Sequence, residues 1–181
     1  MQRFLGVASR RGDRKIGAMK SRGFSLLELC VGLALVALLA SLATPTFRSS
    51  LRAAAVRTAT FELMAGLQQT RGTAIVESHA GVLCLADATG NCRASGDAAP
   101  AWRAFLEEAG GGRTLFTRAL PRDVTVRGSR ARIRFSPRAL AASAATLTIC
   151  DAQGVAAPRA IVISQNARAR LAAASDAECR A

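Results

Sequence analysis

The segment from residue 24 to residue 47 constrains this chain most, because it is apolar enough to cross a membrane yet contains a carboxylate. In FSLLELCVGLALVALLASLATPTF the only charged side chain is Glu28. About 20 apolar residues span a bilayer as a helix. Seven Lys and Arg residues and one Asp precede the segment. This placement predicts a single-pass protein with a cytoplasmic N-terminus and an exported remainder.

Glu28 separates three interpretations of this segment: a secretory signal ending at "SLA", a plain membrane anchor, and a signal cut before the apolar run. A carboxylate in hydrocarbon costs about 2.5–3.5 kcal/mol on insertion scales, so neither a disposable signal nor a passive anchor needs it. Cleavage between Gly23 and Phe24 explains it. The new amino group of Phe24 would lie one helical turn from Glu28, and the carboxylate of one subunit could pair with the amine of its neighbour.

The stretch "RGFSLLEL" resembles the signature of type IV prepilins: a basic leader ending in glycine, then Phe, a small polar residue, an apolar pair and Glu. The resemblance implies that a prepilin peptidase cuts after Gly23 and N-methylates Phe24, and that Glu28 acts in assembly. It also implies a helix kink at Pro45. Met19 would give the shorter leader "MKSRG", and we expect translation to start there.

The helical pattern continues beyond Pro45. Apolar and small residues recur at three- and four-residue steps as far as Val76, which predicts an amphipathic helix whose second half lies against a domain. The residues of this pattern are Phe47, Leu51, Ala54, Thr58, Phe61 and Ala65.

The period then changes to two. Short runs such as "GVLCLA", "DVTVRG", "ARIRFS" and "TLTICD" alternate with turn sequences such as "DATGN" and "DAQG". We therefore expect an α+β fold in which one long N-terminal helix packs on a small antiparallel β-sheet head. The predicted organisation is a leader at 1–23, a transmembrane half-helix at 24–47, a periplasmic half-helix at 48–78 and a β-rich head at 79–181.

Cysteine placement indicates disulfides. Cys30 lies in the apolar segment, and four cysteines follow the predicted membrane crossing, where the compartment is oxidising. Of the three pairings that four cysteines allow, we favour Cys84–Cys92, which closes a short loop, and Cys150–Cys179, which holds the C-terminal tail to a strand. Zinc is less favoured because there are no paired C-x-x-C sequences.

No catalytic constellation is apparent, so an enzyme is not expected, and neither a cofactor nor a metal is. The single histidine, His79, falls at the expected end of the helix, and no glycine-rich phosphate loop follows a strand.

The net charge of +13 favours nucleic acid or an anionic membrane as a partner, although an Ala- and Arg-rich chain that is nearly free of Lys also fits the codon bias of a GC-rich genome. In "GSRARIRFS" a strand would place Arg130, Arg132 and Arg134 on one face and Ile133 and Phe135 on the other. This predicts either a solvated arginine ladder or a track for phosphates.

The head also resembles a family. The order of two cysteines and a tryptophan, then "RIRFSPRAL", "TLTICD" and "RAIVISQNARAR", is similar to the GspH/FimT family of minor pilins and pseudopilins. Some FimT members bind DNA through a Gly-Arg-x-Arg motif. Here Arg168 and Arg170 match its arginines, whereas Ala167 replaces the glycine. If that glycine serves a positive φ, alanine resists the conformation.

The resemblance implies an inner-membrane minor pilin whose head lies in the periplasm and which assembles with other pilins through its N-terminal helix. We favour a FimT-like subunit of a type IV pilus that binds DNA without sequence preference. The alternatives are the H pseudopilin of type II secretion and, from a different class, a membrane-anchored periplasmic DNA receptor outside any filament.

Overall fold

The computed structural model describes residues 25–138 and 141–180, except for the side chains of residues 42–45. Gly23 and Phe24 lie outside the described residues, so the cleavage and N-methylation expected there stay predictions. The chain divides into two compact units, Met1–Ser41 and Leu42–Ala181. Each unit is treated by itself below.

One long helix, α1 (Leu26–Val76), contributes to both units. It begins directly after Ser25, whose carbonyl accepts a hydrogen bond from the Leu29 amide at 3.1 Å. It ends at Val76, as the sequence predicts, and Ser78 follows with a φ of 55°. A left-handed residue just past the last turn is a common helix terminator, and it redirects the chain into the first strand.

The first unit contains the apolar part of α1. Its large side chains are exposed in the isolated chain, for example Leu26 at 82%, Leu33 at 62% and Leu39 at 66%. No single helix among the described residues is long and apolar enough to cross a membrane. Leu26–Ser41 and Thr46–Val76 reach the required length and composition only when they are taken together. The kink expected at Pro45 stays a prediction.

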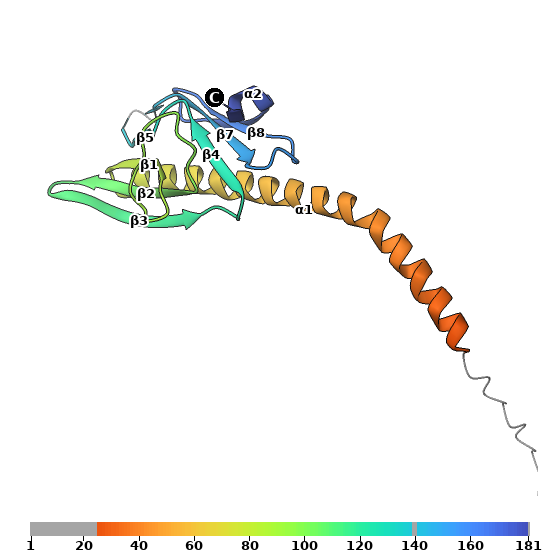
Figure 1. Cartoon of the computed structure of the whole chain (residues 1–181). Helices are drawn as coiled ribbons and strands as arrows, with labels where there is room; N and C mark the ends of the chain where they lie inside the picture. Colours follow the sequence, from red (N-terminus) through yellow and green to blue (C-terminus); the bar gives the residue numbers. More distant parts are fainter. Residues whose placement is uncertain (1–24, 139–140, 181) are drawn as a thin grey trace, which may run out of the picture. The chain divides into compact units, whose positions relative to one another are not determined.

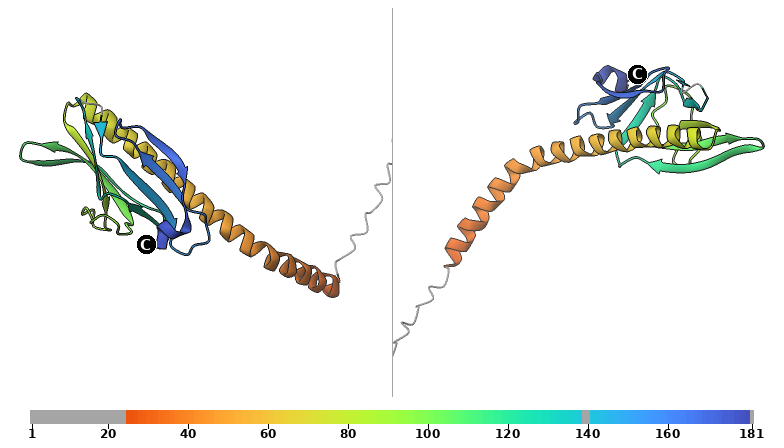
Figure 2. Two further views of the ribbon diagram at one scale, coloured as in Figure 1. Left: turned by 90° about the horizontal axis from the view of Figure 1, so that it is seen from above. Right: turned by 180° about the vertical axis from the view of Figure 1, so that it is seen from behind.

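The second unit packs two antiparallel sheets on the remainder of α1 (Figures 1 and 2). The five-stranded sheet has the order β3-β2-β1-β5-β6, and the four-stranded sheet has the order β4-β7-β8-β9. The strands are β1 (Ala80–Ala86), β2 (Ala101–Glu108), β3 (Gly111–Ala119), β4 (Val124–Gly128), β5 (Arg132–Ser136), β6 (Ala141–Ala142), β7 (Ala145–Asp151), β8 (Arg159–Ile163) and β9 (Ala169–Ala173). A short helix, α2 (Asp176–Arg180), follows them. This is the expected α+β class.

One hydrophobic core joins α1 to both sheets. The helix contributes Val56, Ala59, Leu63, Leu67 and Ala74; the five-stranded sheet contributes Leu83, Leu85, Trp102, Leu106, Ile133 and Phe135; the four-stranded sheet contributes Val124, Val126, Leu147, Ile149, Ile161 and Ile163. The helix and Trp102 are in close contact, because a Cβ atom at Gly66 would lie 2.1 Å from the indole ring. A glycine is therefore required at this point of the helix.

The prediction of which helix face packs on the head is wrong. Phe47, Leu51 and Phe61, which belong to the expected packing face, are 65%, 55% and 53% exposed. The face that packs contains Leu63 and Leu67 and lies on the opposite side of the helix. At 100° per residue the two faces are about 180° apart, so this part of α1 has two apolar faces, of which the head covers one.

Candidate functional site

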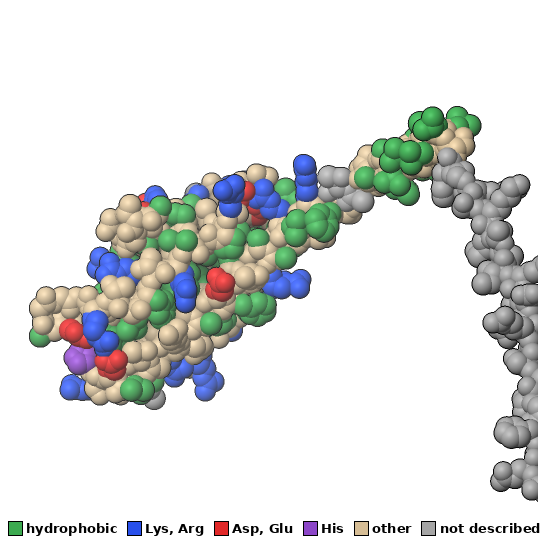
Figure 3. All heavy atoms as spheres, turned by 90° about the horizontal axis from the view of Figure 1, so that it is seen from below, with side chains coloured by type: hydrophobic (Ala, Val, Ile, Leu, Met, Phe, Trp, Pro, Cys, Tyr) green, Lys and Arg blue, Asp and Glu red, His purple; other side chains and the backbone are tan. Residues whose placement is uncertain are grey.

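The uncovered apolar face of α1 is the first candidate surface. Within the second unit it consists of Phe47, Leu51, Ala54, Thr58, Phe61 and Ala65, all of them exposed. Figure 3 shows hydrophobic side chains exposed among arginines on the underside of this unit. We call these six residues the outer stripe. A stripe of this length on one helix face is a surface that another helix can pack against.

Glu28 lies in the first turn of α1 and is exposed. An acidic side chain at this position interacts favourably with the positive end of the helix dipole. Its predicted partner, the amino group of Phe24 in a neighbouring subunit, lies outside the described residues, so the structure does not test that pair.

The second candidate surface is the β8–β9 turn, which contains Arg168 and leads into β9, where Arg170 is the second residue. Both arginines are exposed. In the turn, the Ala167 amide donates to the Ser164 carbonyl, and the Ser164 amide donates to the Arg168 carbonyl, each at 3.0 Å. Ala167 has a φ of 59°. Alanine thus adopts the left-handed conformation that glycine would adopt with less strain.

Arg71 of α1 helps to hold this turn. Its Nη1 donates a hydrogen bond of 3.2 Å to the carbonyl oxygen of Ala167, and the Ala167 side chain is 3% exposed within the core. The helix therefore positions the backbone from which Arg168 projects. The sequence did not indicate this contact, because 96 residues separate its partners.

The predicted arginine ladder is only partly formed. Ile133 and Phe135 are buried and Arg132 and Arg134 are exposed, as expected. Arg130, however, precedes β5, and its Nε donates to the carbonyl oxygen of Ala144 at 3.0 Å. Arg134 forms an ion pair of 2.7 Å with Glu107. The like charges are thus spread between a turn and a strand, and one of them is neutralised.

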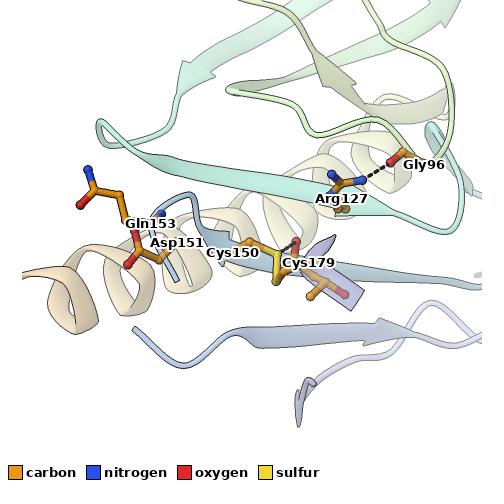
Figure 4. The surroundings of a disulfide bond; sticks show 7 residues. Gly96, Arg127, Cys150, Asp151, Gln153 and Cys179 are labelled. Carbon is orange, nitrogen blue, oxygen red and sulfur yellow. Dashed lines mark hydrogen bonds between the residues drawn. A yellow bond between two sulfur atoms is a disulfide. The ribbon is translucent and has the colours of Figure 1, made fainter. Parts of the chain in front are cut away.

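Both predicted disulfides are present. Cys84–Cys92 joins β1 to the following loop, and Cys150–Cys179 holds α2 to β7. Figure 4 shows the second disulfide with Arg127 nearby on β4, where the Arg127 guanidinium donates to the carbonyl of Gly96. Since α2 has no buried residue, packing contributes little to its position, and this disulfide is what holds it to the sheet.

A buried carboxylate ties α1 to the four-stranded sheet. The Asp151 side chain is 1% exposed and lies 3.2 Å from Arg52, which also reaches Asp123 at 3.0 Å. Burial alone would raise the pKa of Asp151. Hydrogen bonds from the backbone amides of Ala156, Gln153 and Val155, together with the charge of Arg52, outweigh burial and hold the pKa below its ordinary value.

The family of the chain follows from comparison of its sequence with known families. The family described as "Type II transport protein GspH" matches residues 59–167. The chain belongs to the GspH family. The match begins in the packed part of α1 and ends at the β8–β9 turn, so it covers most of this GspH chain's head and stops one residue before Arg168.

Two crystal structures resemble this GspH chain. Both are of the type IV minor pilin FimU from Pseudomonas aeruginosa PAO1, in two space groups. Each has a TM-score of 0.49 and 19% sequence identity; the matches cover 64% and 65% of the GspH chain and 91% and 87% of the FimU chains. No curated protein matches the sequence.

Among the described residues of this GspH chain, no group of three or more His, Cys, Asp and Glu side chains is arranged to hold a metal ion. His79 is exposed, and its Nδ1 lies 2.6 Å from the carbonyl oxygen of Glu77. This contact is within the turn that ends α1.

Proposed function

We propose that this chain is a non-enzymatic minor pilin-like subunit that is anchored in the inner membrane and assembles into a filament through α1. The observation that carries the proposal is the pair of opposite apolar faces on α1. The head covers the inner face, so the outer stripe exposes Phe47, Leu51 and Phe61. Fully burying side chains of this size stabilises by about 1.5–3 kcal/mol each, so the stripe favours association with a partner helix.

The N-terminal signature supports the same proposal. Cleavage at Gly23 by a prepilin peptidase would free the amino group of Phe24, and Glu28 of a neighbouring subunit would pair with it. A charged pair offsets the cost of placing a carboxylate in the membrane, and it fixes the axial register of neighbouring helices. The exposed leucines of the apolar part of α1 would then lie in lipid before assembly and against other pilin helices afterwards.

The test of assembly compares Phe61→Ser with Val155→Ser in the native host. Val155 is also 53% exposed but lies in the β7–β8 loop, outside the outer stripe. After chemical cross-linking of membranes, adducts with other pilin-like subunits should be lost in Phe61→Ser and in Glu28→Ala and be kept in Val155→Ser. Equal adducts in all the variants would refute assembly through α1 and favour a receptor outside any filament.

As the finer function we propose a FimT-like role in a type IV pilus, in which Arg168 and Arg170 bind DNA. Both guanidinium groups are exposed, and in the described part of the chain neither forms an ion pair. Arginine binds phosphate through paired hydrogen bonds, and such contacts carry no sequence information. Arg132 is also exposed and could extend the same basic surface.

DNA binding is tested on the full chain in detergent by fluorescence anisotropy at increasing salt. Arg168→Ala/Arg170→Ala should weaken binding and lower the salt slope by about 1–2, because each phosphate contact contributes about 0.9. Arg57→Ala/Arg159→Ala, which removes the same charge from residues outside the proposed DNA-binding set, is the control and should bind DNA like the wild type. If the wild type does not bind DNA at low salt, the DNA proposal fails, and the H pseudopilin of type II secretion becomes the favoured role.

A further inference from the structure

A groove with two arginines lies between α1 and the last strand of the four-stranded sheet. Its volume is about 460 Å³. The lining residues are Ala53 and Arg57 from α1, Ala157 and Pro158 from the loop before β8, Arg159 from the first position of β8, and Leu171, Ala172 and Ala173 from β9. We propose that this groove binds an acidic, extended segment of a partner protein. The proposal does not depend on DNA binding.

The floor of the groove is apolar. Leu171 pairs in register with Ile161, which is fully buried, so the two side chains lie on the same face of the sheet and both point to the core side. Leu171 is nevertheless 42% exposed. The four-stranded sheet therefore extends past the part of its core face that α1 covers, and an apolar strip is left over.

The edge of β9 supplies the main-chain groups that an extended segment needs. In the four-stranded sheet β9 pairs with β8 on one side, and no described strand pairs with its other side. An unpaired edge presents backbone N–H and C=O groups to an added strand, which is a common mode of peptide recognition. A helical partner pairs its main-chain groups internally and does not use this edge.

The charge of the groove selects an acidic partner. Arg57 projects from α1 and Arg159 from β8, and neither forms an ion pair among the described residues. Arg159 pairs in register with Ile149, so its stem lies on the core face while its guanidinium reaches solvent. Only every second side chain of an added strand faces the groove. Two arginines beside an apolar floor therefore match a strand whose groove-facing side chains include both carboxylates and apolar groups.

This groove is distinct from the candidate DNA surface. Arg170 pairs with Val162, so it lies on the face of the sheet opposite Leu171. DNA does not pair with a strand edge, whereas a peptide does. The two ligands are therefore expected to depend on different arginine pairs, which gives a control of matched charge.

The test uses the full chain in detergent and a fluorescein-labelled peptide of the repeat Glu-Thr-Val-Thr. In an extended strand one face of this peptide alternates Glu and Val, and the other face carries only uncharged Thr. Binding is followed by fluorescence anisotropy. Arg57→Ala/Arg159→Ala should weaken binding at least about tenfold, since a single hydrogen bond between charged groups contributes enough for that. Arg168→Ala/Arg170→Ala, which removes the same charge, should leave binding unchanged. A peptide with N-methylated alternate residues keeps its charge but should not bind, because it cannot pair with β9.

Three results would overturn the proposal: equal weakening by the two double variants, equal binding of the N-methylated peptide, or displacement of the peptide by a DNA oligonucleotide. The first and third would assign the peptide to the general basic surface. Failure of DNA binding by the wild type would leave this test unaffected.

Discussion

Replacing Gly66 by alanine should destabilise the head even though it improves a helix. Glycine in a helix interior is about 1 kcal/mol less favourable than alanine, so on local grounds the change stabilises α1. In the folded protein, however, the new Cβ would lie 2.1 Å from one atom of the Trp102 ring and 2.4 Å from another. Ordinary carbon contacts are about 3.5–4.0 Å.

The ring has little room to move away. Trp102 is 2% exposed and packs edge-on against Phe116, with ring centroids 5.4 Å apart. Restoring normal contact needs a shift of more than about 1 Å in a close-packed core, where overpacking costs roughly 1–3 kcal/mol and occasionally more. For a contact as short as 2.1 Å we expect the overpacking cost to lie at the upper end of this range, about 3 kcal/mol. After the helix gain is subtracted, we expect a net loss of about 2 kcal/mol.

Gly72 provides the matched control, because it lies in the same helix with nothing within 4 Å of a Cβ atom. Gly72→Ala should stabilise the protein by about 0.5–1 kcal/mol. The assay is urea unfolding of the full chain, followed by far-ultraviolet circular dichroism. Trp102→Phe, which removes the clashing part of the ring, should reduce the cost of Gly66→Ala in a double-mutant cycle. Equal stability of Gly66→Ala and Gly72→Ala would refute the packing argument.

Three further predictions concern the four-stranded sheet. Asp151→Asn should cost about 2–3 kcal/mol of folding stability at neutral pH. Because the folded pKa of Asp151 is lowered, the stabilisation by its carboxylate is present above about pH 4 and is lost as pH falls through the folded pKa. The melting temperatures of the wild type and of Asp151→Asn should therefore converge in acid. Loss of the Cys150–Cys179 bond, which spans 29 residues, should cost about 3.6 kcal/mol in thermal unfolding. Ala167→Gly should change stability by less than about 0.5 kcal/mol, since relief of the left-handed strain offsets the lost methyl burial, whereas Ala167→Val should be clearly destabilising in the same assay.

Much of the fold could be predicted from local patterns. The end of α1 at Val76, the antiparallel strands and the two disulfides follow from periodicity, turn residues and cysteine spacing. The two-residue strand β6 and the short helix α2 were missed. Neither contains enough residues to show a period, and α2 depends on its disulfide and not on burial.

The packing face of α1 could not be predicted because both faces are apolar. In the sequence, Phe47 and Phe61 make the outer stripe look like the more hydrophobic face. The packed face contains threonines, which a hydrophobicity pattern counts as polar. Thr60 and Thr70 are nevertheless fully buried. Each hydroxyl donates at 2.7 Å to the carbonyl four residues earlier, so burial leaves no donor unsatisfied. Only the sheets show which face the head covers.

The basic surface could be predicted only in part, because ion pairs between residues far apart in the sequence neutralise some of its arginines. Strand alternation gave the faces of Arg132 and Arg134 correctly. It could not show that Glu107 neutralises Arg134, since Glu107 lies on β2, two strands away across β1. The alternation of side chains along a strand therefore shows which face of the sheet a charge lies on. The order of the strands decides which of these charges are left without an ion-pair partner and can bind a ligand.

The two faces of α1 should separate folding from assembly. Leu63 is fully buried, and Phe61, only two residues earlier, is 53% exposed. Leu63→Ala should cost about 2–5 kcal/mol in urea unfolding, because it leaves a cavity between the helix and both sheets. Phe61→Ser should change stability by less than about 0.5 kcal/mol, since the side chain touches little of the head, yet it should abolish cross-linking to other subunits. If Phe61→Ser unfolds as easily as Leu63→Ala, the outer stripe belongs to the core of the head itself and the case for a subunit interface on α1 is lost.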